Sequence, residues 1–325
     1  MTSLRFIFQR VTKAVMVVIA IVILNFFLIR LAPGDPAMVL AGEAGAADPK
    51  FVEQLQEQFG LNKPLIEQLW IYLKGFLTFD LGFSYRQQRT VASLILERMP
   101  ATILLTMTAF LIAVTGGIIL GTLAARQAGR WLDSAISTLA LLCYATPLFW
   151  IALMAVLLFS VVVNWLPAIG METVGGQLTG VAYLQDVTRH LILPASILGL
   201  FYIALYTRLI RASMLEIGNQ DFIRTARAKG VSEARILWVH QLRNALLPII
   251  TMAGLQAGHL IGGAVVVETV FAWPGIGRLA FDALLQRDYN LLLGIFFVSA
   301  AMVVIFNLIT DLLYGVVDPR IDITI

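Results

Sequence analysis

The chain has 325 residues, of which 59% are hydrophobic and only 13% are charged, and its formal net charge is +3. Ordinary soluble domains carry a charge on about a quarter of their residues. This composition, with a mean hydropathy of +0.85, therefore excludes a soluble globular protein and indicates a polytopic membrane protein. The single cysteine, Cys143, excludes an intrachain disulfide and a cysteine-based zinc cluster.

Apolar runs long enough to cross a hydrocarbon core of about 30 Å, which takes roughly 20 helical residues, recur along the chain. The third run is longer than a straight span needs, so we expect it to tilt or to bend at Pro147. An even number of spans puts both ends of the chain on one side of the membrane. We expect an all-α fold with six transmembrane helices, at 14–31, 101–124, 134–163, 190–210, 245–267 and 291–317.

Basic residues indicate which side this is, because short cytoplasmic loops of membrane proteins are enriched in lysine and arginine. With the N-terminus inside, thirteen cations fall on the cytoplasmic side, and the two short outer loops hold only Arg189, Arg278 and Arg287. The other seven lie in or beside segment 32–100, which is too long for the rule to apply. The sequence predicts an N-in, C-in topology with an uncleaved first helix, because Ala32–Asp35 does not resemble a signal-peptidase site.

Segment 32–100 carries helical patterns, and we expect a helical extracytoplasmic region there. Asp48 followed by Pro49 is typical of a helix start, and Gly60 ends the apolar repeat that follows. A second helix is expected to open at Pro64, with a broad apolar face for the membrane or for other helices. Two roles fit the segment: a covering subdomain, or a docking surface for an external partner. The predicted division has three parts: 1–31 with the tail and first helix, 32–100, and a five-helix core at 101–325.

The stretch 211–246, between the fourth and fifth predicted helices, is polar and rich in cations. A short helix is predicted from Asp221 to Lys229, and Gly230 follows where a left-handed residue commonly ends a helix. The positive-inside rule alone accounts for the charges, but it does not account for the small residues, which suit close docking by another protein. The expected low-relief cationic surface consists of Thr225, Ala226, Arg227, Ala228 and Lys229.

A second helix is predicted to start directly after Gly230. Ser232 is a good N-cap residue, and Glu233 favours the first turn of a helix electrostatically. Val231 and Ile236 have the spacing of a hydrophobic staple. The sequence thus predicts two helices that meet at a sharp glycine turn.

The loop and several other stretches match one family of membrane proteins. The loop reads "DFIRTARAKG" and then "VHQLRNALLP". It resembles the cytoplasmic "EAA" loop of ABC-importer permeases, in the form used by the dipeptide/oligopeptide/nickel branch. Of the general motif only Ala226 and Gly230 are present, Arg224 and Thr225 replace its first two residues, and Pro248 comes five residues late. Further stretches resemble the same branch in the same order: "RLAPGDPA", "FGLNKPL", "FDLGFS", "SMLE", "VVVETVFAWPGIGRLAFDAL", "QRDY" and "DLLYGVVDPR".

The resemblance implies a type I ABC-importer permease in the bacterial cytoplasmic (inner) membrane, and di- or oligopeptides as its solutes. Nickel complexes and glutathione-like peptides remain alternative solutes within the branch. The chain contains no G-x-x-x-x-G-K-[ST] loop, so it is expected to be no enzyme and to bind no cofactor or metal itself. The implied partners are two ATP-binding subunits that hold ATP and Mg, a second homologous permease, an extracytoplasmic solute-binding protein and membrane lipid, with no nucleic acid.

The resemblance also implies a role for the loop. Its first helix would be the coupling helix, seated in a groove of an ATPase, and ATPase closure would move the fifth helix through the glycine turn as a rigid body. The coupling residues implied in this way are Asp221, Arg224, Thr225, Ala226, Arg227, Ala228, Lys229, Gly230 and Glu233.

The fifth predicted helix carries a stripe of small residues. Gly254, Gly258 and Gly262 recur every four residues, which allows another helix to approach closely, and Gln256 and His259 are polar in the same span. Tight helix packing explains these residues from the sequence alone. The resemblance adds a second interpretation, in which they line the translocation path.

Other chemistry is sparse. Glu268 and Asp311 are expected near helix ends where water can reach them, with interfacial solvation or a structural salt bridge as their role. This position disfavours an ion-coupled secondary transporter, since such carriers use ionisable groups near the membrane midplane. No G-x-S-x-G or H-E-x-x-H motif supports a membrane hydrolase. Gly117 and Gly121 form a weaker packing stripe on the second helix. The histidines are too scattered for a metal site: His190, His240 and His259.

Overall fold

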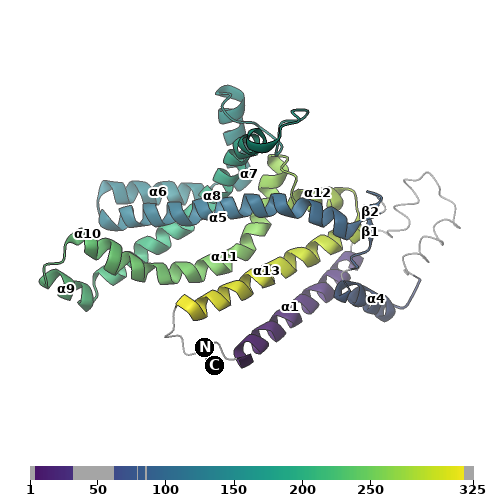
Figure 1. Cartoon of the computed structure of the whole chain (residues 1–325), viewed down its shortest axis with the longest axis horizontal. Coiled ribbons are helices and arrows are strands. Elements are labelled where there is room, and N and C mark those ends of the chain that lie inside the picture. Colours follow the sequence, from purple (N-terminus) through teal and green to yellow (C-terminus); the bar gives the residue numbers. More distant parts are fainter. Residues whose placement is uncertain (1–3, 32–61, 79, 85, 318–325) are drawn as a thin grey trace. The chain divides into compact units, whose positions relative to one another are not determined.

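The computed structural model describes residues 4–31, 62–78, 80–84 and 86–317, and helices make up most of the described chain (Figure 1). The chain divides into two compact units, and the division passes through one long helix between Pro100 and Ala101. The first unit is Met1–Pro100 with Arg278–Ile305, and the second is Ala101–Gly277 with Phe306–Ile325.

Among the residues that the structure describes, the first unit holds two N-terminal helices and a small hairpin. The strands of the hairpin pair antiparallel, with Phe83 opposite Thr90, and α4 contacts α1. The described elements of this unit are α1 (Leu4–Leu31), α4 (Leu65–Leu77), β1 (Phe83–Ser84), β2 (Arg89–Thr90), the start of α5 (Val91–Arg126), most of α12 (Ile276–Leu285) and the first part of α13 (Tyr289–Val317).

A buried carboxylate attaches the hairpin to the start of α13. The hydroxyl of Ser84 donates to the carboxylate of Asp288, and both side chains are buried. The same carboxylate accepts the backbone N–H of Leu291 at 3.2 Å, as an N-cap does, and Asn290 Nδ2 donates to the carbonyl of Phe83 at 3.1 Å. The hairpin and the α13 start are therefore one hydrogen-bonded block.

The second unit is a helical bundle around α8. This helix contacts α6, α7 and α11, and its buried residues include Leu198, Tyr206 and Ile210. The described elements of this unit are the rest of α5, α6 (Trp131–Ala145), α7 (Leu148–Ala155), the π-helix η1 (Val156–Val162), α8 (Gly180–Gly218), α9 (Asp221–Ala228), α10 (Glu233–Arg235), the π-helix η2 (Ile236–Leu242), α11 (Arg243–Val270), the first residues of α12 and the last part of α13.

Glycines let α5 approach α8 closely. A Cβ added to Gly117 would lie 2.3 Å from Cβ of Tyr206, and one added to Gly121 would lie 2.7 Å from Cβ of Ile210. At such distances any residue larger than glycine would clash with α8. The packing stripe predicted on the second helix is confirmed, and it is the contact between α5 and α8.

The bend expected at Pro147 is confirmed. The helix stops at Ala145 and resumes at Leu148, and the two segments, Trp131–Ala145 and Leu148–Val162, differ in direction by 102°. Thr146 has extended dihedral angles, φ −81° and ψ 135°, as a residue before proline prefers. Proline thus replaces one long span by two helices at nearly a right angle.

Two helices are longer than the apolar runs predicted. The start of α5 is Val91 instead of residue 101, because Val91, Leu94 and Ile95 bury an apolar face before Pro100. Helix α8 extends well beyond 190–210 in both directions. By length and composition three helices of the described residues, α5, α8 and α13, suit a membrane crossing, or four if the bent pair counts as one span.

The outer segment is described only in part. Helix α4 starts directly after Pro64, as predicted, and the carbonyl of Pro64 accepts the N–H of Gln68 at 3.0 Å. Its apolar side chains Ile66 and Trp70 are exposed. The helix predicted between Asp48 and Gly60 lies outside the described residues.

Candidate functional site

The end of α9 has the backbone geometry of a Schellman motif. The N–H of Val231 donates to the carbonyl of Ala226 at 3.1 Å, and the N–H of Gly230 donates to that of Arg227 at 2.9 Å. Gly230 adopts the left-handed conformation, with φ +76°, so the predicted glycine turn is confirmed. A Cβ added to Gly230 would meet nothing within 4 Å. Backbone conformation, and not crowding, is therefore the reason for glycine here.

A small apolar core joins the two arms of this turn. Ile223 and Ile236 are fully buried against each other's helices, and Val231 packs on them, which confirms the hydrophobic staple. Ala226 is 9% exposed and belongs to the same core, so it is not part of the surface predicted for it. The reason is helical spacing: Ala226 lies three residues after Ile223, on the buried face of α9.

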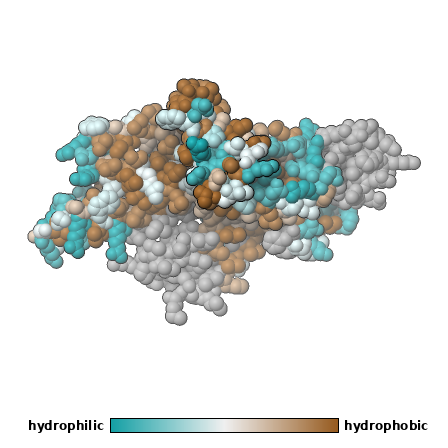
Figure 2. Space-filling view, turned by 45° about the horizontal axis from the view of Figure 1, so that its top comes forward, coloured by the Kyte–Doolittle hydropathy of each residue, from teal (hydrophilic) through white to brown (hydrophobic). Residues whose placement is uncertain are grey.

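We call residues 221–243 the elbow. Its exposed charges are partly paired with one another: Arg227 Nε lies 2.9 Å from Glu233 Oε1, and Arg224 Nη1 lies 3.4 Å from Asp221 Oδ1. The Arg227–Glu233 pair bridges the two arms across the turn. Thr225 and Ala228 of α9 are exposed, and so is Lys229 directly after it. Figure 2 shows hydrophilic residues gathered at the end of the second unit that carries α9 and α10.

The second arm differs from the prediction in two details. Ser232 occupies the N-cap position, but the hydrogen bond there comes from its backbone: its carbonyl accepts the N–H of Ile236 at 3.0 Å, and its side chain makes no capping bond. The arm then continues as the π-helix η2 directly into α11. No break separates the second arm from α11, so this arm and α11 form one continuous helix.

Exposed aromatic residues on the elbow were not singled out from the sequence. Phe222 is 45% exposed on α9, and Trp238 is 58% exposed on η2. Large apolar side chains exposed within a polar, charged surface are typical of protein interfaces. The signal that could have found Phe222 is its position: it precedes the buried Ile223 and so falls on another face of the helix.

The predicted stripe of α11 is only partly described. Gln256 is half-buried in α11, while the surroundings of Gly254, Gly258, His259 and Gly262 lie outside the described part. Their role in packing or in a path stays a prediction.

Glu268 corrects a prediction. The sequence places it at the far end of the fifth helix, and water was expected to reach it. Its side chain is instead 0% exposed, and its carboxylate accepts the hydroxyl of Thr102 at 2.7 Å. The helix end is covered by the turn that follows it and by α5, so burial is decided by packing and not by position along the helix.

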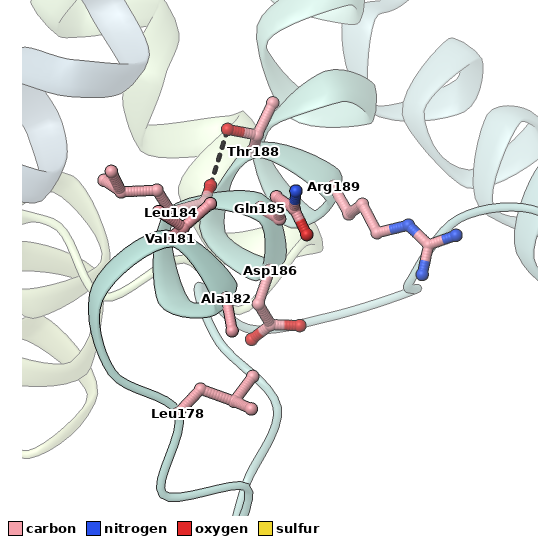
Figure 3. A pocket seen from close by; sticks show the side chains of 8 residues that line it. All are labelled: Leu178, Val181, Ala182, Leu184, Gln185, Asp186, Thr188 and Arg189. Atoms are coloured by element: carbon pink, nitrogen blue, oxygen red, sulfur yellow. Dashed lines mark hydrogen bonds between the residues drawn. The ribbon is translucent and has the colours of Figure 1, made fainter.

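A surface groove of about 730 Å³ lies at the start of α8, between that helix and the loop before it (Figure 3). Asp186 of this region accepts the backbone N–H and the hydroxyl of Thr173, at 2.6 and 2.8 Å, which ties the loop to the helix. His190 contacts the carbonyl of Asp186 at 2.9 Å and is buried. The groove is lined by Leu178, Val181, Ala182, Leu184, Gln185, Asp186, Thr188 and Arg189.

Two family models match most of the sequence. The model described as binding-protein-dependent transport system inner membrane component matches residues 117–323, and the model of the N-terminal part of such membrane components matches residues 3–106. The elbow and α11 both lie within the first match.

Relatives match from end to end. A putative peptide transport system permease protein of Brucella abortus (strain 2308) is 42% identical over 324 residues, and 99% of each chain is covered. The dipeptide transport system permease protein of Escherichia coli (strain K12) is 40% identical over 335 residues, with 98% of each covered. The di/tripeptide transport system permease protein of Pseudomonas aeruginosa (strain UCBPP-PA14) is 39% identical over 332 residues, again with 98% of each covered.

A solved structure shares the fold. The inward-facing MetNI methionine ABC transporter has a chain that superposes with a TM-score of 0.56 at 16% sequence identity, covering 70% of this chain and 97% of that one. The mostly helical architecture is thus that of an ABC-importer permease.

Proposed function

The chain belongs to the family of binding-protein-dependent transport system inner membrane components, and from that premise we propose that it is the permease subunit of an ATP-driven importer of di- and oligopeptides. The observation that carries the solute class is the end-to-end match, at 39 to 42% identity, to permeases of peptide, dipeptide and di/tripeptide systems. The family is a transport component, so ATP hydrolysis is assigned to partner subunits.

The proposed topology has six spans with both termini in the cytoplasm. Helical segments occur at all six apolar runs, which supports this count. The elbow then lies in the cytoplasm, and the groove at the start of α8 faces the other side. The excess of cations on the elbow side supports the same orientation.

The elbow is the proposed contact with the ATPases. Its exposed cations and the exposed Phe222 give α9 a surface that combines charge with one apolar anchor. The Schellman turn, the small core and the Arg227–Glu233 pair hold α9 rigidly against the second arm. Because that arm runs into α11 without a break, displacement of α9 moves α11.

Reconstitution tests this function. The chain is placed in liposomes with its two ATPases, the second permease and the solute-binding protein, and uptake of labelled alanyl-alanine is measured. Uptake should require ATP and should persist when ionophores collapse proton and sodium gradients. Uptake driven by an ion gradient without ATP would instead make the chain a secondary transporter.

Solute and topology have separate tests. Mass spectrometry of the solute retained by the binding protein should find short peptides, whereas a nickel complex or a glutathione-like peptide would change the solute and keep the importer. In intact cells, a membrane-impermeant amine reagent should leave Lys229 unlabelled. Labelling of Lys229 from outside would overturn the orientation and the coupling role of the elbow together.

A further inference from the structure

The end of α11 that lies away from the elbow contains a buried carboxylate, Glu268, which the proposed contact with the ATPases does not explain. Glu268 is 25 residues beyond Arg243, the first residue of α11, which corresponds to about 38 Å of helix. A carboxylate without solvent exposure is stable only where hydrogen bonds or charges compensate its lost hydration. The contacts around it therefore show which segments depend on it.

Thr102 connects Glu268 to the turn that follows α11. The Thr102 hydroxyl donates to Glu268 Oε1 at 2.7 Å and accepts the backbone N–H of Ile276 at 2.8 Å. A hydroxyl has one hydrogen and two lone pairs, so Thr102 can be the donor in the first bond and the acceptor in the second at the same time. Thr102 is 1% exposed, so bulk solvent does not reach its hydroxyl.

Trp273 adds two bonds to the same block. Its backbone N–H donates to the carbonyl of Glu268 at 2.8 Å, and its indole Nε1 donates to the carbonyl of Ala101 at 2.9 Å. The turn 271–276 is thus held to α11 on one side and to α5 on the other.

The block is packed without space around the carboxylate. A Cβ added to Gly275 would lie 2.2 Å from Glu268 Oε1, and one added to Gly277 would lie 2.7 Å from Cα of Val265. Such a network resists gradual deformation and transmits strain, because close-packed interiors have low compressibility.

The loop before α8 is tied to this turn as well. The backbone N–H of Gly170 donates to the carbonyl of Phe271 at 2.8 Å, and Thr173 of the same loop is held by Asp186 of α8. A movement at the end of α11 therefore reaches the loop that borders the groove.

We propose that Glu268 and Thr102 are a pair of positioning residues that transmit the displacement of α11 to the turn 271–276 and to the loop attached to it. This inference rests on the proposed function, in which ATPase closure moves α11 from the elbow. The pair makes the far end of α11, the turn and the part of α5 around Thr102 move as one body. Without the pair, α11 moves and the turn does not follow, so ATP is hydrolysed without delivery of solute.

The test compares Thr102→Val with Thr102→Ser in the complete reconstituted importer. Valine keeps the shape and removes both hydrogen bonds, whereas serine keeps the hydroxyl. We measure the ratio of solute taken up to ATP hydrolysed. For Thr102→Val this ratio should fall roughly tenfold, within the span of about 5- to 150-fold typical of couplings between sites, and Thr102→Ser should stay near the wild-type ratio.

A purely structural role gives a different result. It would lower the amount of assembled complex, and uptake and hydrolysis would then fall together at an unchanged ratio. That outcome overturns the proposal. If the wild-type protein shows no ATP-dependent uptake at all, the proposed function itself fails. If the wild type does take up solute and Thr102→Val has the wild-type ratio, only the proposed role of the pair fails.

Hydrogen exchange on wild-type complex gives a second, independent readout. The amides of Trp273 and Ile276 should change their exchange rate when a non-hydrolysable ATP analogue closes the ATPases. Unchanged exchange in the turn, with altered exchange in the elbow, would overturn the proposal even if Thr102→Val failed to assemble.

Discussion

The two ends of α11 are stiff for different reasons. At the elbow, the backbone sets the geometry: a left-handed glycine, two Schellman bonds and a core of a few apolar residues, with the charges in solvent. At the other end, buried side chains set it: the Thr102 hydroxyl bonds to the Glu268 carboxylate and to a backbone N–H, and the Trp273 indole bonds to a backbone carbonyl.

The difference indicates which substitutions each end tolerates. An elbow that has to accept a partner protein keeps its charges exposed, and exposed charges contribute little to folding. A buried network depends on each polar atom, because an orphaned donor or acceptor loses about 1–3 kcal/mol. One glycine at each end illustrates the difference. Gly230 is needed for its positive φ angle, whereas Gly275 is needed because a side chain there would collide with Glu268.

The largest effect is expected from Gly275→Ala. The new methyl group would occupy the position of the Glu268 carboxylate and displace it from Thr102. Overpacking of this kind costs about 1–3 kcal/mol, and the broken hydrogen bond adds to it. Thermal unfolding of the purified protein in detergent should show a clear loss of stability. A Gly275→Ala protein as stable as wild type would mean that the network is loosely packed.

Gly230→Val tests the elbow, with Gly230→Asn as its matched control. Valine in a left-handed conformation costs about 1–3 kcal/mol, and asparagine tolerates that conformation far better. Valine should leave the protein in the membrane but lower uptake and solute-stimulated ATP hydrolysis, and asparagine should retain most of both. If both variants lost uptake and ATP hydrolysis equally, the cause would be crowding against a partner protein and not the φ angle of residue 230.

A smaller effect is expected from Trp273→Phe. The ring stays buried, but the indole N–H bond to the carbonyl of Ala101 is lost, at a cost of about 1 kcal/mol. The unfolding temperature should fall modestly. A drop as large as that of Gly275→Ala would show that the indole contributes more than its one hydrogen bond.

The smallest effect on folding is expected from breaking the Arg227–Glu233 pair. Both side chains are largely exposed, so Arg227→Gln should lower stability by about 0.2–1 kcal/mol at most. Its effect on ATPase binding should be larger than its effect on unfolding, and both should weaken at high salt. The single variant Glu233→Gln separates the effect on ATPase binding from the effect on the ion pair. If Arg227 contacts the ATPase directly, removal of Glu233 alone should leave ATPase affinity nearly unchanged.

Features that depend on local chemistry could be predicted from the sequence. The helical class, the bend at Pro147 and the left-handed Gly230 each follow from the periodicity or the backbone of a short stretch. The staple of Val231 and Ile236 follows from spacing within one motif. These parts agree between sequence and structure because few distant contacts are needed to produce them.

The tertiary structure decided the features that need contacts between distant segments. Thr102 and Glu268 are 166 residues apart, and only the packing of α5 against the end of α11 removes that carboxylate from water. The same holds for Gly117, because a larger residue there is excluded only by the close approach of Tyr206 of α8. A sequence states which residue types are present along a helix, but burial is a property of the neighbours that the folded chain brings to them.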